Sequence, residues 1–240
     1  MSTSDTGRDP LAGSAWSNAG TVAGFVQAPP NATLMRFAEG ERARGAGRLL
    51  DIGCGAARNA LPLAQAGWDV TAVDLSRPML LAAAERDRAE YPAGRIRLAF
   101  AAMDHLPVRD RSMDLIVAHG IWNLATSSTR FRAAVREAAR VARPGAALFL
   151  FTFSRATLPR DASPVAGETF VFTQFSGAPQ IFLTAAQLLT ELHDAGFEPD
   201  AGVPLTELNK PKPGALTFGG PPVIYEGAFR YAGTPDLLIP

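Results

Sequence analysis

Three features of this 240-residue sequence predict an α/β fold with a mostly parallel sheet. Short apolar stretches alternate with helical patterns, which is the order expected of β-α-β units. The first apolar stretch ends in a glycine turn that opens directly into a helical pattern. A later stretch, AALFLFTF, is apolar on both faces, as a central parallel strand should be. The expected parallel strands are 49–52, 68–75, 96–100, the stretch that begins at Met113, and 146–153.

The charge balance and the single cysteine narrow the classes of function. The chain carries 23 basic and 23 acidic residues, which argues against a polyanion-binding surface. Cys54 is the only cysteine, so no intramolecular disulfide, CxxC metal site or iron–sulfur cluster is expected. No apolar run reaches the roughly 18 residues of a membrane span, and no apolar leader follows the polar start of the chain. We expect a cytoplasmic protein with no metal, and neither nucleic acid nor a membrane as its partner.

The glycine turn is the first candidate ligand site. Leu49–Ile52 is apolar apart from Asp51, and Gly53 and Gly55 follow it directly. Glycines permit positive φ and close backbone approach, so a nucleotide-like ligand can lie against the turn. A strand-to-helix turn also needs glycine for purely structural reasons, and this alternative stays open. A helix is expected from Ala56 to Gly67.

The second strand supplies an acid in a position suited to a ribose. Trp68–Leu75 ends on Asp74-Leu75, and Asp74 lies 23 residues beyond Asp51. In a β-α-β unit, a carboxylate at this point faces the crevice and accepts hydrogen bonds from two vicinal hydroxyls.

Together these motifs resemble a known family. LLDIGCGAARNALPLA followed by VTAVDLS is similar to motif I and its sequel in class I S-adenosyl-L-methionine (SAM)-dependent methyltransferases. The Arg58-Asn59 pair is especially similar to the tellurite-resistance and thiopurine methyltransferase branch, and the likeness spans about residues 47–153. It implies a Rossmann-like, seven-stranded, mostly parallel sheet with an antiparallel C-terminal strand pair and a small cap. One departure is Ala57, where the family often has a third glycine.

The resemblance implies SAM as cofactor, S-adenosyl-L-homocysteine (SAH) as product, and a set of binding residues. After the third strand the family places an acid against the adenine amino group, and Asp104 is the candidate, although a surface acid is the alternative. The implied cofactor residues are Asp51, Gly53, Cys54, Gly55, Arg58, Asp74, Leu75, Met103, Asp104 and His119.

The loop after the fourth strand should face the transferred methyl group. Methyl transfer is an in-line displacement, so the enzyme must align a nucleophile, exclude water and, for some acceptors, take a proton. His119 is the most suitable base by residue type, but in related enzymes this position often contributes only a backbone carbonyl to the cofactor. Trp122 is a candidate to pack against the sulfonium or an aromatic acceptor, and a core role is the alternative.

The domain organisation follows from the same resemblance. Residues 1–46 are expected to be an N-terminal arm or lid, and residues 47–240 the methyltransferase domain. A cap, with a hairpin as its expected form, is inserted at about 154–183. An apolar acceptor chamber is expected, and ordinary core packing is the alternative for each ring. The substrate-binding candidates are Trp16, Phe25, Trp122, Phe170 and Phe172.

The remaining elements are expected from caps and periodicity. Capping residues mark the expected helix starts. These are Asn31 or Thr33, Ser76 followed by Pro78, Thr129, and the Thr184–Gln187 capping box. The last two strands are expected at Phe197–Leu208 and Val223–Tyr231, joined by a Pro- and Gly-rich connection.

Two classes of function follow. The first is a SAM-dependent methyltransferase acting on a small molecule. The second is another nucleotide-binding protein, either an NAD(P)-dependent oxidoreductase or a SAM-binding protein without transferase activity. The turn lacks the glycine with which a dinucleotide fingerprint packs its helix, which disfavours the oxidoreductase. O-, N-, S- and metalloid acceptors all stay open, except that one cysteine excludes a thiol-rich arsenic site.

Overall fold

A computed structural model describes residues 10–210 and 221–233. The chain divides into two compact units, Met1–Ala102 and Met103–Pro240, and each is described by itself. The polar start of the predicted arm and most of the predicted connection before the last strand lie outside the described residues.

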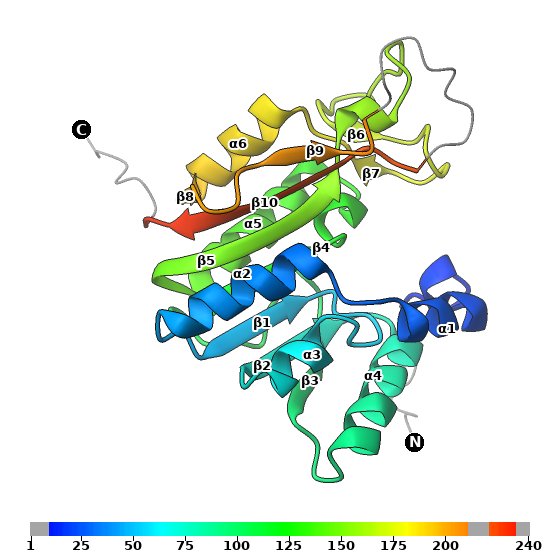
Figure 1. Cartoon of the computed structure of the whole chain (residues 1–240). Coiled ribbons are helices and arrows are strands. Elements are labelled where there is room, and N and C mark those ends of the chain that lie inside the picture. Colours follow the sequence, from blue (N-terminus) through cyan, green and yellow to red (C-terminus); the bar gives the residue numbers. More distant parts are fainter. Residues whose placement is uncertain (1–9, 211–220, 234–240) are drawn as a thin grey trace, which may run out of the picture. The chain divides into compact units, whose positions relative to one another are not determined.

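The first unit contains three parallel strands that pair in the order β3-β2-β1. Leu50 pairs with Thr71, and Ala72 pairs with Leu98. The α1 helix packs beside α4 (Figure 1). The strands are β1 Arg48–Ile52, β2 Asp69–Asp74 and β3 Ile96–Phe100, and the helices are η1 Ala15–Ser17, α1 Ala19–Gln27, α2 Ala32–Ala43, α3 Ala60–Gln65 and α4 Arg77–Glu90.

Helix caps in the first unit agree with two sequence predictions. The Asn31 side chain accepts a hydrogen bond of 2.9 Å from the Leu34 amide, and the Ser76 hydroxyl accepts one of 3.3 Å from the Met79 amide. The prediction of a helix from Ala56 was wrong in its start, because the glycine turn continues and α3 begins only at Ala60. The α1 helix was not predicted, since its sequence contains two glycines.

The second unit contains both parallel and antiparallel strands. In it, β4 pairs in parallel with β5, and β10 runs antiparallel to β5 and pairs with both β8 and β9 (Figure 1). The strands are β4 Met113–His119, β5 Ala142–Phe153, β6 Val171–Phe172, β7 Gln180–Ile181, β8 Phe197–Pro199, β9 Thr206–Leu208 and β10 Ile224–Tyr231, and the helices are η2 Trp122–Leu124, α5 Ser128–Val141, η3 Arg155–Thr157 and α6 Ala185–Asp194. The predicted parallel strands followed by antiparallel C-terminal strands are confirmed.

Two local predictions in this unit were wrong. Ser127, not Thr129, caps α5, because the Ser127 hydroxyl accepts a hydrogen bond of 3.2 Å from the Arg130 amide. The single strand predicted at Phe197–Leu208 is split into β8 and β9. The Asp200 side chain accepts a 2.7 Å hydrogen bond from the Gly202 amide and turns the chain between them. The Thr184–Gln187 capping box of α6 is confirmed.

The 154–183 segment has its own small core and is hydrogen-bonded to the start of α5. Its strands β6 and β7 form an antiparallel pair, and Phe172, Phe182 and Leu158 form a buried cluster. Both oxygens of the Glu168 carboxylate accept from the Ser128 amide, at 3.3 and 3.2 Å. A carboxylate at a helix N-terminus is favourable because it meets the positive end of the helix dipole.

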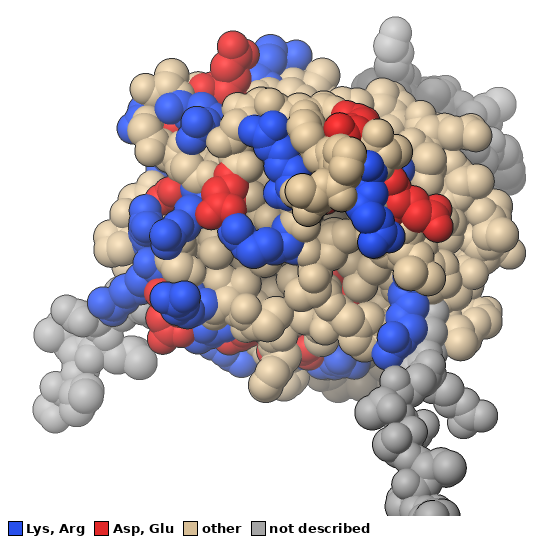
Figure 2. Space-filling view, turned by 90° about the horizontal axis from the view of Figure 1, so that it is seen from below, with Lys and Arg blue, Asp and Glu red and all other residues tan. Residues whose placement is uncertain are grey.

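Acidic and basic side chains are interspersed on the face drawn in Figure 2, with uncharged surface between them. Among the described residues, no helix is both long and apolar enough to cross a bilayer.

Candidate functional site

The glycine turn after β1 contains three left-handed residues. Gly53, Gly55 and Ala57 have φ values of 70°, 52° and 58°. Ala57 therefore adopts, with a side chain, a conformation that favours glycine, at a cost of about 1–2 kcal/mol. Alanine thus stands where the family that this motif resembles often has a third glycine, and its backbone is still in the left-handed region.

Asp74 ties this turn to the start of α4. Its Oδ2 accepts a 2.8 Å hydrogen bond from the Gly55 amide, and its Oδ1 accepts one of 2.7 Å from the Ser76 amide. The amides of Gly53 and Cys54 both donate to the Val73 carbonyl, at 2.8 and 3.0 Å. The Gly55 and Ser76 bonds fix the Asp74 carboxylate at the carboxyl end of β2, beside the glycine turn.

Asp51 is a buried acid with an unsatisfied oxygen. Asp51 is only 1% exposed, and its Oδ2 has no hydrogen-bond partner among the described residues. Burial and, to a smaller extent, the Asp74 charge raise the pKa of Asp51 against the opposing Arg58 charge, and together they bring it to about 7. Burial also lowers the pKa of the Arg58 guanidinium, against the Asp51 charge. The site can therefore accept a hydrogen-bond donor, and a cationic donor would stabilise the ionised carboxylate.

The other cofactor candidates of this unit are Cys54, within the turn, and Leu75, after β2. Cys54 is 5% exposed, and burial raises the pKa of its thiol well above the usual range, so it is a small apolar wall and a poor nucleophile. Leu75 is half-buried directly after β2.

Two side chains that position the turn were not predicted to do so. Arg86 in α4 donates a hydrogen bond to the Ala56 carbonyl. The Asn59 side chain accepts a 3.0 Å hydrogen bond from the Asn31 amide and so ties the start of α2 to the turn. Asn59 stands in the motif, whereas no sequence signal marks Arg86.

The N-terminal arm packs against the glycine turn. A Cβ built on Gly55 would lie 3.1 Å from Cδ1 of Phe25. Phe25 and Trp16 form an edge-to-face pair with centroids 6.0 Å apart, and the Ser76 hydroxyl donates a 2.9 Å hydrogen bond to the Trp16 carbonyl. Both predicted arm residues therefore lie at the candidate cofactor site of the first unit.

In the second unit, Met103 and Asp104 follow β3 in the chain and are half-buried. Asp104 forms an ion pair of 3.3 Å with Arg130 of α5. His119 ends β4 and stacks on Phe151, with ring centroids 4.1 Å apart and planes 12° from parallel.

The three aromatic candidates of this unit are buried. Trp122, Phe170 and Phe172 are 0%, 2% and 3% exposed. Phe131 of α5 contacts the rings of Trp122 and Phe170, with centroid distances of 6.2 and 5.7 Å. Trp122 Nε1 has no hydrogen-bond partner in the described part of the chain. In this structure these rings belong to apolar cores.

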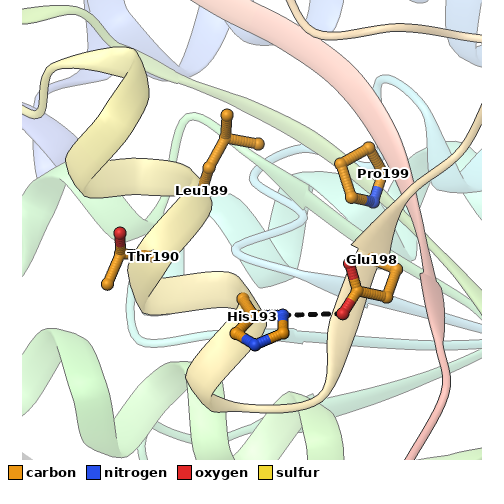
Figure 3. A pocket seen from close by; sticks show the side chains of 5 residues that line it. All are labelled: Leu189, Thr190, His193, Glu198 and Pro199. Carbon is orange, nitrogen blue, oxygen red and sulfur yellow. Dashed lines mark hydrogen bonds and ion pairs between the residues drawn. The ribbon is translucent and has the colours of Figure 1, made fainter.

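A shallow surface hollow lies between α6 and β8, lined by Leu189, Thr190, His193, Glu198 and Pro199 (Figure 3). His193 Nδ1 and Glu198 Oε1 are 2.6 Å apart across it. None of the predicted site residues lines this hollow, and its exposed ion pair contributes little. No group of three or more metal-ligating side chains occurs within residues 10–210 and 221–233.

Comparisons with known proteins agree with the motif assignment. Residues 49–145 match the sequence profile of a family described as a methyltransferase domain. Over 119 residues the chain is 39% identical to the ubiquinone/menaquinone biosynthesis C-methyltransferase UbiE of Syntrophotalea carbinolica, covering 48% of this chain and 47% of that protein. Over 173 residues it is 29% identical to the 27-O-demethylrifamycin SV methyltransferase of Amycolatopsis mediterranei, covering 70% and 60%. The chain spans about half the length of most curated relatives that it matches.

A solved SAM-dependent methyltransferase from Methanosarcina mazei superimposes with a TM-score of 0.61. The two chains are 20% identical, and the match covers 85% of this chain and 98% of that one. At this identity the likeness confirms the Rossmann-like α/β fold alone.

Proposed function

We propose that this protein is a SAM-dependent methyltransferase that acts on a small-molecule acceptor. The observation that carries the proposal is the Asp74 carboxylate, which is held between the Gly55 and Ser76 amides at the end of β2. It lies in the segment that matches the methyltransferase profile. A fixed acid beside a glycine turn suits a nucleoside with a free ribose diol.

The proposed cofactor contacts follow from the geometry of each residue. Asp74 accepts from the ribose hydroxyls, and Gly53 and Gly55 let the turn approach the amino-acid end. Asp51 accepts from the cofactor's ammonium, which would satisfy its buried oxygen, and Arg58 lies near enough to influence the pKa of Asp51. The other proposed cofactor contacts are Cys54, Leu75, Met103, Asp104 and the backbone carbonyl of His119.

SAM supplies an electrophilic methyl group on a sulfonium. The protein's part is to orient the acceptor and exclude water, so that the sulfonium charge is lost in an apolar setting. We assign the acceptor wall to Trp16 and Phe25, which lie at the glycine turn, and not to Trp122, Phe170 and Phe172, which are buried in apolar cores. Relatives named as a ubiquinone/menaquinone biosynthesis C-methyltransferase and a 27-O-demethylrifamycin SV methyltransferase support a small organic acceptor.

The finer assignments rest on sequence alone. The Arg58-Asn59 pair favours the tellurite-resistance and thiopurine branch. Residues 1–46 form the arm, residues 47–240 the catalytic domain, and about 154–183 its cap. We also propose a cytoplasmic location.

The proposal is tested by incubating the purified protein with methyl-labelled SAM and a small-molecule extract of the source cells. Label in a low-molecular-weight product, together with SAH formation, is the expected result. An Asp74→Ala variant is the control. SAH binding without any transfer of label would favour the alternative of a non-catalytic SAM-binding protein, and binding of NAD in place of SAH would favour the oxidoreductase.

A further inference from the structure

The chain from Leu106 to Asp110 is held along α5 by two charged side chains. Glu137 Oε2 accepts a 2.8 Å hydrogen bond from the Leu106 amide. Arg140 Nη2 donates one of 3.0 Å to the Leu106 carbonyl. Both backbone polar groups of Leu106 are thus bound by an ion pair, as a neighbouring strand would bind them.

Arg140 makes further contacts with the same segment. Its Nη1 donates to the Val108 carbonyl at 2.8 Å and to the Asp110 carboxylate at 2.6 Å. It also holds Glu137 with two bonds, at 2.7 and 2.8 Å. The hydrogen bonds from Arg140 lower the pKa of Glu137, so both partners stay charged near neutral pH. The planar guanidinium allows this many simultaneous bonds, and a lysine ammonium does not.

This pair differs from an ordinary surface ion pair in what it binds. The chain between β3 and β4 has no helix or strand, and Glu137 and Arg140 bind its backbone at Leu106 and Val108. Arg130, on the same helix, pairs with Asp104. Because 130 and 137 are two helical turns apart, both lie on one side of α5. The helix therefore holds the segment at Asp104 and again at Leu106–Asp110.

We propose that Glu137 and Arg140 are positioning residues that set how selectively the protein recognises the adenine ring of its cofactor. The inference rests on the proposed function, in which Met103 and Asp104 contact the cofactor. Leu106 is only two residues beyond Asp104, so a shift of the Leu106 peptide moves the adenine contacts as well. Neither Glu137 nor Arg140 touches the cofactor in this account. They act through the backbone that they fix.

The test uses two ligands of the full-length protein, SAH and S-inosylhomocysteine, in which a carbonyl replaces the adenine amino group. Calorimetry gives both affinities for the parent protein, Arg140→Lys and Glu137→Gln. Arg132→Lys is the matched control, because Arg132 also forms a hydrogen-bonded ion pair with both oxygens of a glutamate, Glu191 of α6, but within the described part of the chain has no hydrogen bond to the 106–110 segment. Circular dichroism at the calorimetry temperature confirms that each variant is folded.

We expect the parent to prefer SAH. Arg140→Lys and Glu137→Gln should lower the affinity for SAH about tenfold and the affinity for S-inosylhomocysteine less than about threefold. The preference for SAH should therefore shrink. Arg132→Lys should keep the parental preference. Equal weakening of both ligands, unchanged SAH affinity, or a parent without preference would each overturn the positioning role. Absence of SAH binding by the parent would instead overturn the proposed function.

Discussion

The ring of Phe25 covers Gly55, with Cδ1 3.1 Å from the place where a Cβ on Gly55 would stand. Phe25 comes from α1, and Gly55 donates its amide to Asp74. The arm, the glycine turn and the proposed ribose acid are therefore in one continuous set of contacts. Two interpretations of the arm, a lid over the cofactor and a structural brace, give different outcomes when it is removed.

Deleting residues 1–28 should leave a folded domain that binds SAH but transfers little label from SAM. The deletion removes Trp16 and Phe25, and it spares the hydrogen bond between the Asn31 amide and Asn59 that anchors α2. Calorimetry with SAH and the labelled-SAM assay measure the two properties. Full transfer would remove the lid hypothesis, and global unfolding by circular dichroism would favour the structural brace.

Replacing Ala57 by glycine should cost less stability than replacing Ala64. Both side chains are 0% exposed, but Ala57 has a φ of 58° and Ala64 lies within α3. Glycine relieves left-handed strain of about 1–2 kcal/mol at Ala57, whereas it costs about 1 kcal/mol within a helix. Urea unfolding of both variants measures the difference. Equal losses of unfolding free energy would mean that Ala57 is not strained.

Asp51 should make the free protein less stable as the pH rises from about 4 to about 7. Its pKa is about 7 in the folded protein against an ordinary value of 3.8, so the folded state binds one more proton than the unfolded state between these pH values. The contribution of Asp51 to the free energy of unfolding is fully present below the pKa of the unfolded state. It is lost as the pH rises to the pKa of the folded state, by an amount on the order of 4 kcal/mol. Above that range this contribution is constant.

The matching experiment compares urea unfolding of the parent protein and Asp51→Asn at pH 5 and pH 8, without cofactor. The asparagine variant should lose less stability between the two pH values, because it has no proton to release. If the stability of Asp51→Asn depended on pH as strongly as that of the parent, the pH dependence would come from other groups.

His119→Ala should change the rate of transfer less than a hundredfold and leave SAH affinity nearly intact, because a backbone carbonyl survives the substitution. The loss of stacking on Phe151 (centroids 4.1 Å apart) is the expected source of a mild effect. Removal of a true base lowers kcat by ~10²–10⁴. A loss in that range at unchanged SAH affinity would promote His119 to the catalytic base.

Local patterns in the sequence were sufficient to predict the strands, the glycine turn and most helix caps. Asn31, Ser76 and the Thr184–Gln187 box succeed because each cap is formed within four residues of chain. The split of the strand before β10 was missed, because alternation of residue types did not reveal the turn at Asp200.

The parts of the site that involve distant residues were less predictable. Arg86 binds the Ala56 carbonyl, and Arg140 binds Leu106, from positions about thirty residues away. An arginine on a helix gives no sequence signal for such a partner. The burial of Trp122, Phe170 and Phe172 also depends on packing between segments, so composition alone left a chamber and a core as equal alternatives.

The most direct test of the central claim is calorimetric titration of the parent protein and Asp74→Ala with SAH and with NAD. We predict that the parent binds SAH far more tightly than NAD. Asp74→Ala should weaken SAH binding more than tenfold, because charge-assisted hydrogen bonds of roughly 1.5–3 kcal/mol each are lost. An Asp69→Ala variant, altered at an exposed acid that pairs with Arg97 at the other end of β2, should bind like the parent. Asp74→Ala binding SAH as tightly as the parent would contradict the account.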